Sequence, residues 1–327
     1  MVETNCGNIG GPKRAGQVAQ YGTSGEGRAS LSWKAWLTFA VLGVVWGLPY
    51  FFIKLALVDL SPACVAWGRI ALGAAVMLPI AWKRGALRSL SEHKGALLGY
   101  AFAELVGPFL LIAIGESWIS SSLAGILVAT LPLILILLAP AFGVREPLST
   151  RRVVGLVIGF VGVVVLLGIG SVHGLEAWLG VGCLLLATLG YASASLIVQK
   201  HLSNTDELGA VAVCLAIATV VLLPVALWSA PIHVPGTLSL VSVGILGVVC
   251  TALALQLYFY LIKQAGAARA SVITYINPAV AALLGVGILH EPFGWAGAAG
   301  LTLILVGSWL STSRHTAAVE SELGPAG

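Results

Sequence analysis

Long apolar runs fill most of the chain, and short segments rich in Gly, Pro, Ser or charged residues separate them. About 20 apolar residues, rising about 1.5 Å each, cross the roughly 30 Å hydrocarbon core of a bilayer. Ten runs approach or reach that length: 36–57, 62–82, 96–115, 121–142, 152–169, 177–198, 208–228, 238–262, 270–289 and 294–311. Because backbone groups in lipid must pair internally, each run is predicted to be helical. The pattern predicts an all-α integral membrane protein with ten transmembrane helices.

Composition agrees with a chain solvated mainly by lipid. Charged residues make up 9% and hydrophobic residues 58% of the 327 residues, with a mean hydropathy of +1.00. Ordinary soluble domains carry about 25% charged residues, so this chain has too few charges to cover a water-facing surface. The polar ends, residues 1–33 and 312–327, are predicted to be disordered cytoplasmic tails.

The distribution of basic residues gives the predicted helices an orientation. With the N-terminus placed in the cytoplasm, fifteen of the seventeen Lys and Arg fall in cytoplasmic segments, and the other two, Lys54 and Arg69, lie within spans. The positive-inside rule predicts this asymmetry. Both termini are therefore expected to be cytoplasmic. The net charge of +4 reflects topology and gives no reason to expect nucleic-acid binding.

The chain also repeats itself once. Residues 145–148 (Arg-Glu-Pro-Leu) match residues 290–293 (His-Glu-Pro-Phe). Further matches pair Gly155 with Gly300, Gly162 with Gly307, Pro132 with Pro278 and Ala124 with Ala270. Each half, 34–169 and 176–311, then carries five spans, and an odd number inverts the second copy in the membrane. Inverted five-helix repeats are typical of secondary transporters, because two opposed halves can exchange conformations.

These features resemble a known family. Its pattern is carried by Trp46-Gly47, Arg69, the run Ala124–Pro132, residues 145–148, the run Gly155–Gly162, and the second-half stretch from Tyr275-Ile-Asn-Pro278 through Gly307, within residues 36–311. The chain resembles the EamA-type permeases of the drug/metabolite transporter superfamily. The resemblance implies a multi-pass protein of the plasma (inner) membrane, with a central cavity formed by spans one to four and six to nine. It also implies efflux of a small metabolite such as an amino acid, while distant relatives carry nucleotide sugars or sugar phosphates.

Two charged residues lie deep within predicted spans. Arg69 is about 10 Å from one end of span two, and Glu104 about 12 Å from the opposite end of span three, by helical rise. Buried charges are expensive in a membrane and are usually paired or functional. Either the two residues form a fixed ion pair, or Arg69 meets a substrate carboxylate while Glu104 meets an amine or carries a proton.

Aromatic and amide side chains gather in the same spans and complete a candidate substrate-binding set. The set comprises Trp46, Tyr50, Arg69, Glu104, Tyr191, Gln256, Tyr258, Tyr275 and Asn277. For each aromatic residue alone, packing is the simpler interpretation. A cavity nevertheless needs apolar walls and a few polar groups, so a transporter would place some of them around its substrate. No catalytic residue is assigned.

Other features leave alternatives open. The Gly155–Gly159 GxxxG pattern allows close helix contact, either within the chain or in a homodimer. Lys54 reaches toward the interface or pairs with Glu116, and the glutamates of the Glu-Pro turns organise a helix start. Five unpaired cysteines and the lack of a Walker motif predict neither a metal nor another cofactor, and no direct use of ATP. A channel and an intramembrane enzyme are the disfavoured alternatives.

Overall fold

The computed structural model describes residues 33–87, 93–143, 149–168, 172–202, 205–258 and 276–312. Every regular element in these ranges is a helix. The α-helices are α1 (Trp33–Ala56), α2 (Pro62–Lys83), α3 (Lys94–Tyr100), α4 (Gly107–Glu116), α5 (Ser121–Val128), α6 (Leu131–Leu138), α7 (Thr150–Gly168), α8 (Gly174–Ile197), α9 (Glu207–Trp228), α10 (Thr237–Gly247), α13 (Asn277–Gly287) and α14 (Trp295–Thr312). Three short segments are wider π-helices: η2 (Ala101–Val106), η4 (Val198–Leu202) and η5 (Val248–Leu253). One segment, η3 (Ala139–Phe142), is a tighter 3-10 helix.

Seven helical stretches are long and apolar enough to cross a membrane. They are Pro62–Lys83, Lys94–Glu116, Ser121–Phe142, Thr150–Leu167, Gly174–Leu202, Glu207–Trp228 and Thr237–Tyr258. These coincide with the second to eighth predicted spans. Three shorter apolar helices, Ala40–Ala56, Asn277–Gly287 and Trp295–Ser311, fall within the first, ninth and tenth. The all-helical membrane class is therefore confirmed for the described residues, while the count of ten spans stays a prediction.

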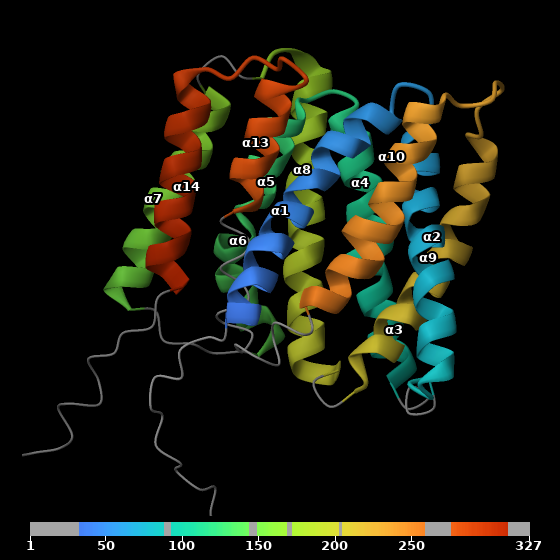
Figure 1. Ribbon diagram of the computed structural model, residues 1–327. Coiled ribbons are helices and arrows are strands. Elements are labelled where there is room, and N and C mark those ends of the chain that lie inside the picture. The colour runs from blue at the N-terminus through green and yellow to red at the C-terminus, as the bar shows by residue number, and fades with distance from the viewer. Residues whose placement is uncertain are drawn as a thin grey trace, which may run out of the picture.

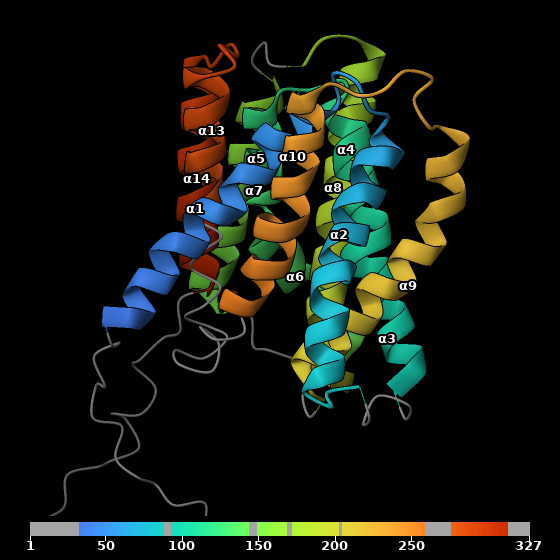
Figure 2. The same ribbon diagram turned by 45° about the vertical axis from the view of Figure 1, so that its right-hand side comes forward.

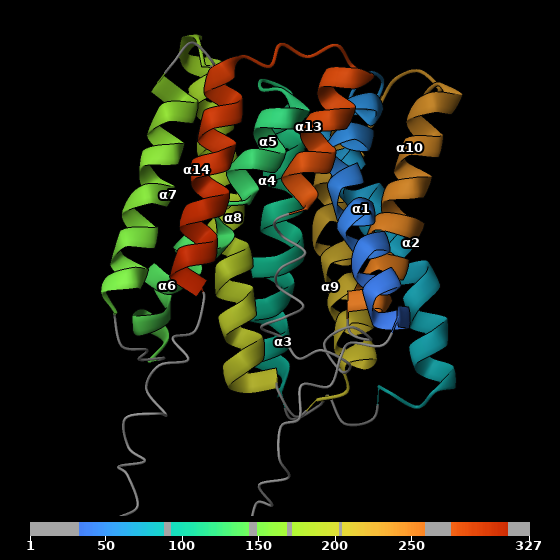
Figure 3. The same ribbon diagram turned by 60° about the vertical axis from the view of Figure 1, so that its left-hand side comes forward.

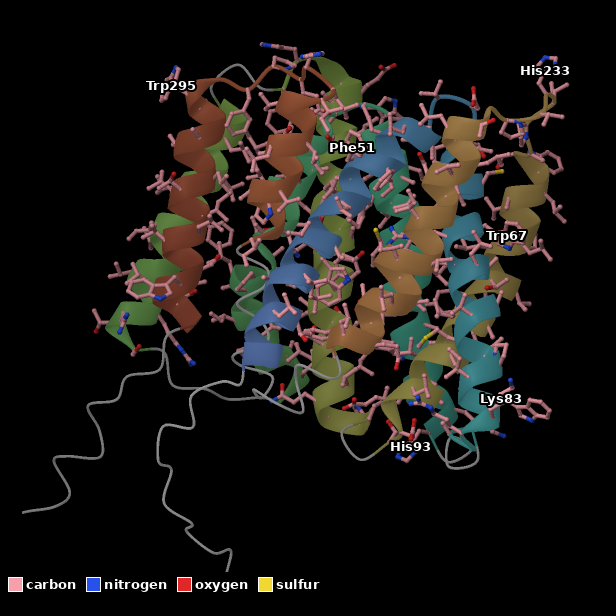
Figure 4. All side chains as sticks on the ribbon, viewed as in Figure 1. Phe51, Trp67, Lys83, His93, His233 and Trp295 are labelled. Carbon is pink, nitrogen blue, oxygen red and sulfur yellow. The ribbon has the colours of Figure 1, made fainter. Side chains whose placement is uncertain are left out.

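The helices stand side by side in one bundle with two distinct ends (Figure 1). The start of α1 and the end of α14 lie at the same end, here called the tail face (Figures 1 and 2). The opposite end, here called the loop face, carries residues 57–61, 117–120, 229–236 and 288–294. Lys83 and His93 lie at the tail face, and His233 and Trp295 at the loop face (Figure 4).

Helices α7 and α14 share the most extensive contact of the described helix pairs, at one edge of the bundle (Figure 3). A Cβ added to Gly155 would meet the backbone of Gly307 at 2.7 Å, and one added to Gly162 would meet that of Gly300 at 2.9 Å. The sequence repeat matches Gly155 with Gly300 and Gly162 with Gly307. In the structure each glycine instead contacts the counterpart of the other: Gly155 contacts Gly307, and Gly162 contacts Gly300. Two copies in opposite orientation produce this exchange across a two-fold axis. The GxxxG face is thus occupied within the chain, while a homodimer stays a prediction.

Wide π-helical turns interrupt two of the membrane spans. Pro108 lies two residues after the end of η2. It has no N–H to donate to the carbonyl oxygen of Glu104, four residues earlier, so the regular α-helical hydrogen bonding is broken there. The turn η5 begins 147 residues after η2, close to the 146 residues that separate Pro132 from Pro278. The two turns therefore occupy matched places in the two halves. Such π-turns are frequent at functional sites.

Candidate functional site

Arg69 lies buried in the middle of α2, 4% exposed. Its Nη2 donates to the Thr251 hydroxyl of η5 at 3.3 Å, and its guanidinium carbon stands 3.9 Å from the ring centre of Phe109 in α4. Its buried Nε has no acceptor among the described residues. The ring face stabilises the cation in part, but one N–H donor is left for another group.

Glu104 sits in η2 and keeps part of its surface free of protein contact. Tyr100, Tyr191 and Tyr258 lie near its carboxylate. Of the two alternatives for these charges, the fixed ion pair is not formed within the described residues; the Arg69 guanidinium contacts Thr251 and Phe109 instead. The two charges are therefore separate features of the site.

Tyr191, on α8, lies near both Glu104 and Arg69 and so connects the two. Tyr50, on α1, joins the Arg69 end and is buried against Gly125 of α5. Together these four side chains form a line of polar groups, here called the polar row, contributed by α1, α2, η2 and α8.

The remaining predicted residues surround the polar row or lie outside the described structure. Trp46 contacts Tyr258, with ring centres 4.8 Å apart, and Gln256 Nε2 lies 3.4 Å from the Met77 sulfur of α2. Asn277 begins α13, where its backbone oxygen faces Gly47 of α1. Each of the four keeps part of its surface free of contact. Tyr275 falls outside the described residues.

Glu291 joins the two halves at the loop face by binding the start of a helix from the other half. Its two carboxylate oxygens accept from the Ser121 N–H at 2.7 Å and the Ser122 N–H at 3.0 Å, and the Ser122 hydroxyl donates at 2.7 Å. These are the first N–H groups of α5, which have no partner within the helix. Burial alone raises the pKa of Glu291, but the hydrogen bonds from Ser122 and Ser121 outweigh it and hold the pKa below its usual 4.5. Glu291 does organise a helix start, as predicted, but in the opposite half. Its repeat counterpart Glu146 lies outside the described residues.

Asp59 makes the reverse connection. It follows α1 in the first half, and its Oδ2 accepts from the Gly236 N–H at 2.9 Å and the Ser239 hydroxyl at 2.8 Å. Both donors lie at the start of α10 in the second half. The loop face is thus held by two carboxylates, each capping a helix of the other half; they are called here the crossed caps.

Lys54 and Glu116 meet at the loop face, as predicted, but not through their charges. The Lys54 ammonium donates to the backbone oxygens of Glu116 at 2.6 Å and Ile119 at 2.8 Å. It therefore caps the end of α4, where a cation also interacts favourably with the helix dipole. The Glu116 side chain is fully buried.

The sequence alone gave no indication that several residues belong to the site. Thr251 and Phe109, the partners of Arg69, are ordinary in an apolar run, and Asp59 is an ordinary loop residue. The position of Thr251 could have been found by extending the repeat, since it stands 147 residues after Glu104, close to the general spacing. In the parts of the chain that the structure describes, no cluster of His, Cys, Asp or Glu is placed to hold a metal.

The fold and the polar row define a multi-pass membrane protein built from two similar halves. The pattern of the EamA-like transporter family matches residues 33–168 and again 178–313. The chain belongs to this family, within the drug/metabolite transporter superfamily that the sequence resembled.

Curated relatives carry transporter names. An "Uncharacterized transporter" of Archaeoglobus fulgidus is 27% identical over 283 residues, covering 86% of this chain and all of that one. The "Uncharacterized inner membrane transporter YedA" of Escherichia coli K12 is 27% identical, over 76% of this chain and 81% of its own. A solved crystal structure at 20% identity covers 85% of this chain and 96% of its own with a TM-score of 0.63, which supports the fold alone. The protein is therefore a membrane transporter by family.

Proposed function

We propose that this protein is a secondary active transporter that exports small metabolites such as amino acids, by alternating access around a central cavity. The observation that carries the proposal is the polar row, because Arg69 keeps a buried Nε without an acceptor among the described residues. A buried donor left unsatisfied costs roughly 1–3 kcal/mol. A substrate oxygen would remove that penalty on binding.

The polar row favours a substrate with both an anionic and a cationic end. Arg69 presents donors suited to a carboxylate, which an arginine binds through two parallel hydrogen bonds. Glu104 supplies an acceptor for a substrate amine. Tyr191 stands near both charges, and Tyr258 with Trp46 adds an aromatic wall beside Glu104. This combination of apolar walls and a few polar groups suits an amino acid.

The proposed orientation places the tail face in the cytoplasm of a cell bounded by an inner membrane. The two basic residues that begin α7, Arg151 and Arg152, support it, as does Lys83 at the tail face (Figure 4). The described loop-face segments carry acidic Asp59 and Glu291 instead. The loop face is then the outer face, and the crossed caps hold it closed in this conformation.

Counterflow in liposomes tests the proposal. Vesicles containing the purified protein are loaded with one unlabelled amino acid or related metabolite, and uptake of the labelled compound is followed. Transient accumulation is the expected result, and Arg69→Gln should need a much higher substrate concentration to show it. Transport of nucleotide sugars with failure of every small metabolite would overturn the substrate class. Flux without saturation or counterflow would indicate a channel.

A further inference from the structure

Glu116 is a buried acid whose carboxylate has no hydrogen-bond partner among the described residues. It ends α4 at the loop face, and its side chain is 0% exposed. Neither carboxylate oxygen accepts a hydrogen bond from the described part of the chain. Of the acidic residues that the structure describes, it alone is fully buried. The polar row does not include it, so its burial calls for a separate explanation.

The groups around Glu116 have other partners. Lys54 of α1 is the nearest cation, but its ammonium is held by two backbone oxygens and makes no ion pair with the carboxylate within the described residues. Arg69 of α2 is engaged with Thr251 and Phe109, and Glu291 with the start of α5. Tyr50 of α1 also lies near, and α8 places Cys183 beside neighbouring Gly115. Helix α5 contributes no titratable side chain.

These surroundings favour the neutral form of the acid. Burying an ionised carboxylate without hydrogen bonds costs several kcal/mol, and attraction to a cation offsets this only in good geometry. Lys54 lacks that geometry, because its ammonium donates to the backbone carbonyls of Glu116 and Ile119 and not to the carboxylate. A protonated carboxyl avoids most of the penalty. The closed loop face therefore suits a Glu116 that holds a proton.

Closure of the loop face and burial of Glu116 involve the same short segment. Residues 117–120 join Glu116 to the start of α5, and Glu291 binds that start directly. Gly285 of α13 fits so tightly here that an added Cβ would collide with Glu291 and Ser122. Separating α5 from α13 would therefore pull on the end of α4 and admit water to Glu116.

We propose that Glu116 is a proton-binding site coupled to the loop face: it takes up a proton from water as this face closes and returns it to water when the face opens. The transport direction and the name of the outer compartment rest on the proposed function, but the coupling of proton and closure does not. Glu116 would then let a pH gradient bias the conformational cycle.

Hydrogen exchange tests the coupling without any substrate. In detergent or nanodiscs, protection of the peptide spanning residues 117–127 reports the closed loop face, because Glu291 holds its amides. After correction for intrinsic exchange, wild-type protection should fall roughly tenfold per pH unit over the range in which Glu116 is protonated in the closed form and ionised in the open form, since opening then releases one proton. Glu116→Gln should show no slope. A flat wild type, or a Glu116→Gln variant that keeps the slope, would overturn the proposal.

Three further variants sharpen the result. Lys54→Gln should move the pH of opening upward, because it removes the cation that favours an ionised Glu116; an unchanged pH of opening would contradict the site. Glu104→Gln and Glu176→Gln each remove another carboxylate and should keep the wild-type slope. Loss of the slope in either would place the proton elsewhere. If exchange behaves as expected but counterflow fails for every small metabolite, the proposed function falls and the proton site stands.

Discussion

The loop face and the polar row satisfy their charged groups in opposite ways. At the loop face, Glu291 accepts three hydrogen bonds and Asp59 accepts two, all from the other half of the chain. In the polar row, Arg69 has one weak hydrogen bond and a buried donor left over among the described residues. Fully bonded charges hold a conformation, whereas unsatisfied ones favour binding of a further group. Under the proposed function, groups of the first kind hold the loop face closed and groups of the second kind would bind the substrate.

The largest effect is expected in the polar row. Arg69→Gln removes a charge-assisted hydrogen bond to the substrate carboxylate, worth about 1.5–3 kcal/mol, so KM for counterflow should rise roughly 10- to 150-fold. Trp67→Phe, on the same helix (Figure 4), is a matched control. It removes the hydrogen bond that the Trp67 indole donates to the Thr219 carbonyl of α9 at 3.0 Å and leaves Arg69 in place. It should lower thermal stability and leave KM unchanged. Equal KM values for Arg69→Gln and wild type would remove Arg69 from recognition.

The Glu291 cap should show the next largest effect, on conformation instead of recognition. Glu291→Ala leaves two N–H groups of α5 without an acceptor, which costs about 1–2 kcal/mol for a helix cap. Exchange in residues 117–127 should therefore accelerate roughly 5- to 30-fold. Gly285→Ala should reproduce the effect with Glu291 present, because its methyl group would occupy the space of the carboxylate. Normal protection in both variants would show that the cap does not hold the loop face.

Asp59→Asn should have a smaller effect at the other crossed cap. The Asp59 side chain is exposed, so water replaces much of what its loss removes, and about 0.5–1 kcal/mol is expected. That corresponds to roughly 2- to 5-fold faster exchange in residues 236–242, with little change in 117–127. An effect of Asp59→Asn on both peptides would mean that the two caps open together.

The sequence predicted the spans and the depth of the charged residues within them, but it did not predict which groups those charged residues contact. Seven predicted spans reappear as long apolar helices, because apolar length is a local property that the chain displays directly. The separation of Arg69 from Glu104 could not be predicted in the same way. It depends on how α2 is rotated against α4 and η5, where Phe109 and Thr251 meet the guanidinium.

The crossed caps lay further beyond prediction. Asp59 and Gly236 are 177 residues apart, and Glu291 and Ser121 are 170 apart. The Glu-Pro repeat marked Glu291 as a turn residue near a helix start, but its helix proved to be α5 of the other half. Only the packing of α5 against α13 brings Glu291 to Ser121, and no local pattern encodes that contact.

The smallest effect expected near neutral pH is the response of the Glu291 cap to acid. Because the hydrogen bonds hold the pKa of Glu291 below its usual 4.5, the cap contributes fully above that value and is lost as the pH falls through the lowered pKa. In a Glu116→Gln background, which removes the other proton site, protection of residues 117–127 should therefore stay constant between about pH 6 and 5 and decline only in stronger acid, a decline absent when Glu291→Ala is added. The sign is opposite to that expected of Glu116, whose ionisation would open the face as the pH rises. A protection maximum between the two limits would show that one carboxylate closes the loop face as an anion and the other as a neutral acid. A decline that begins well above pH 5, or that persists in Glu291→Ala, would remove Glu291 from the acid response.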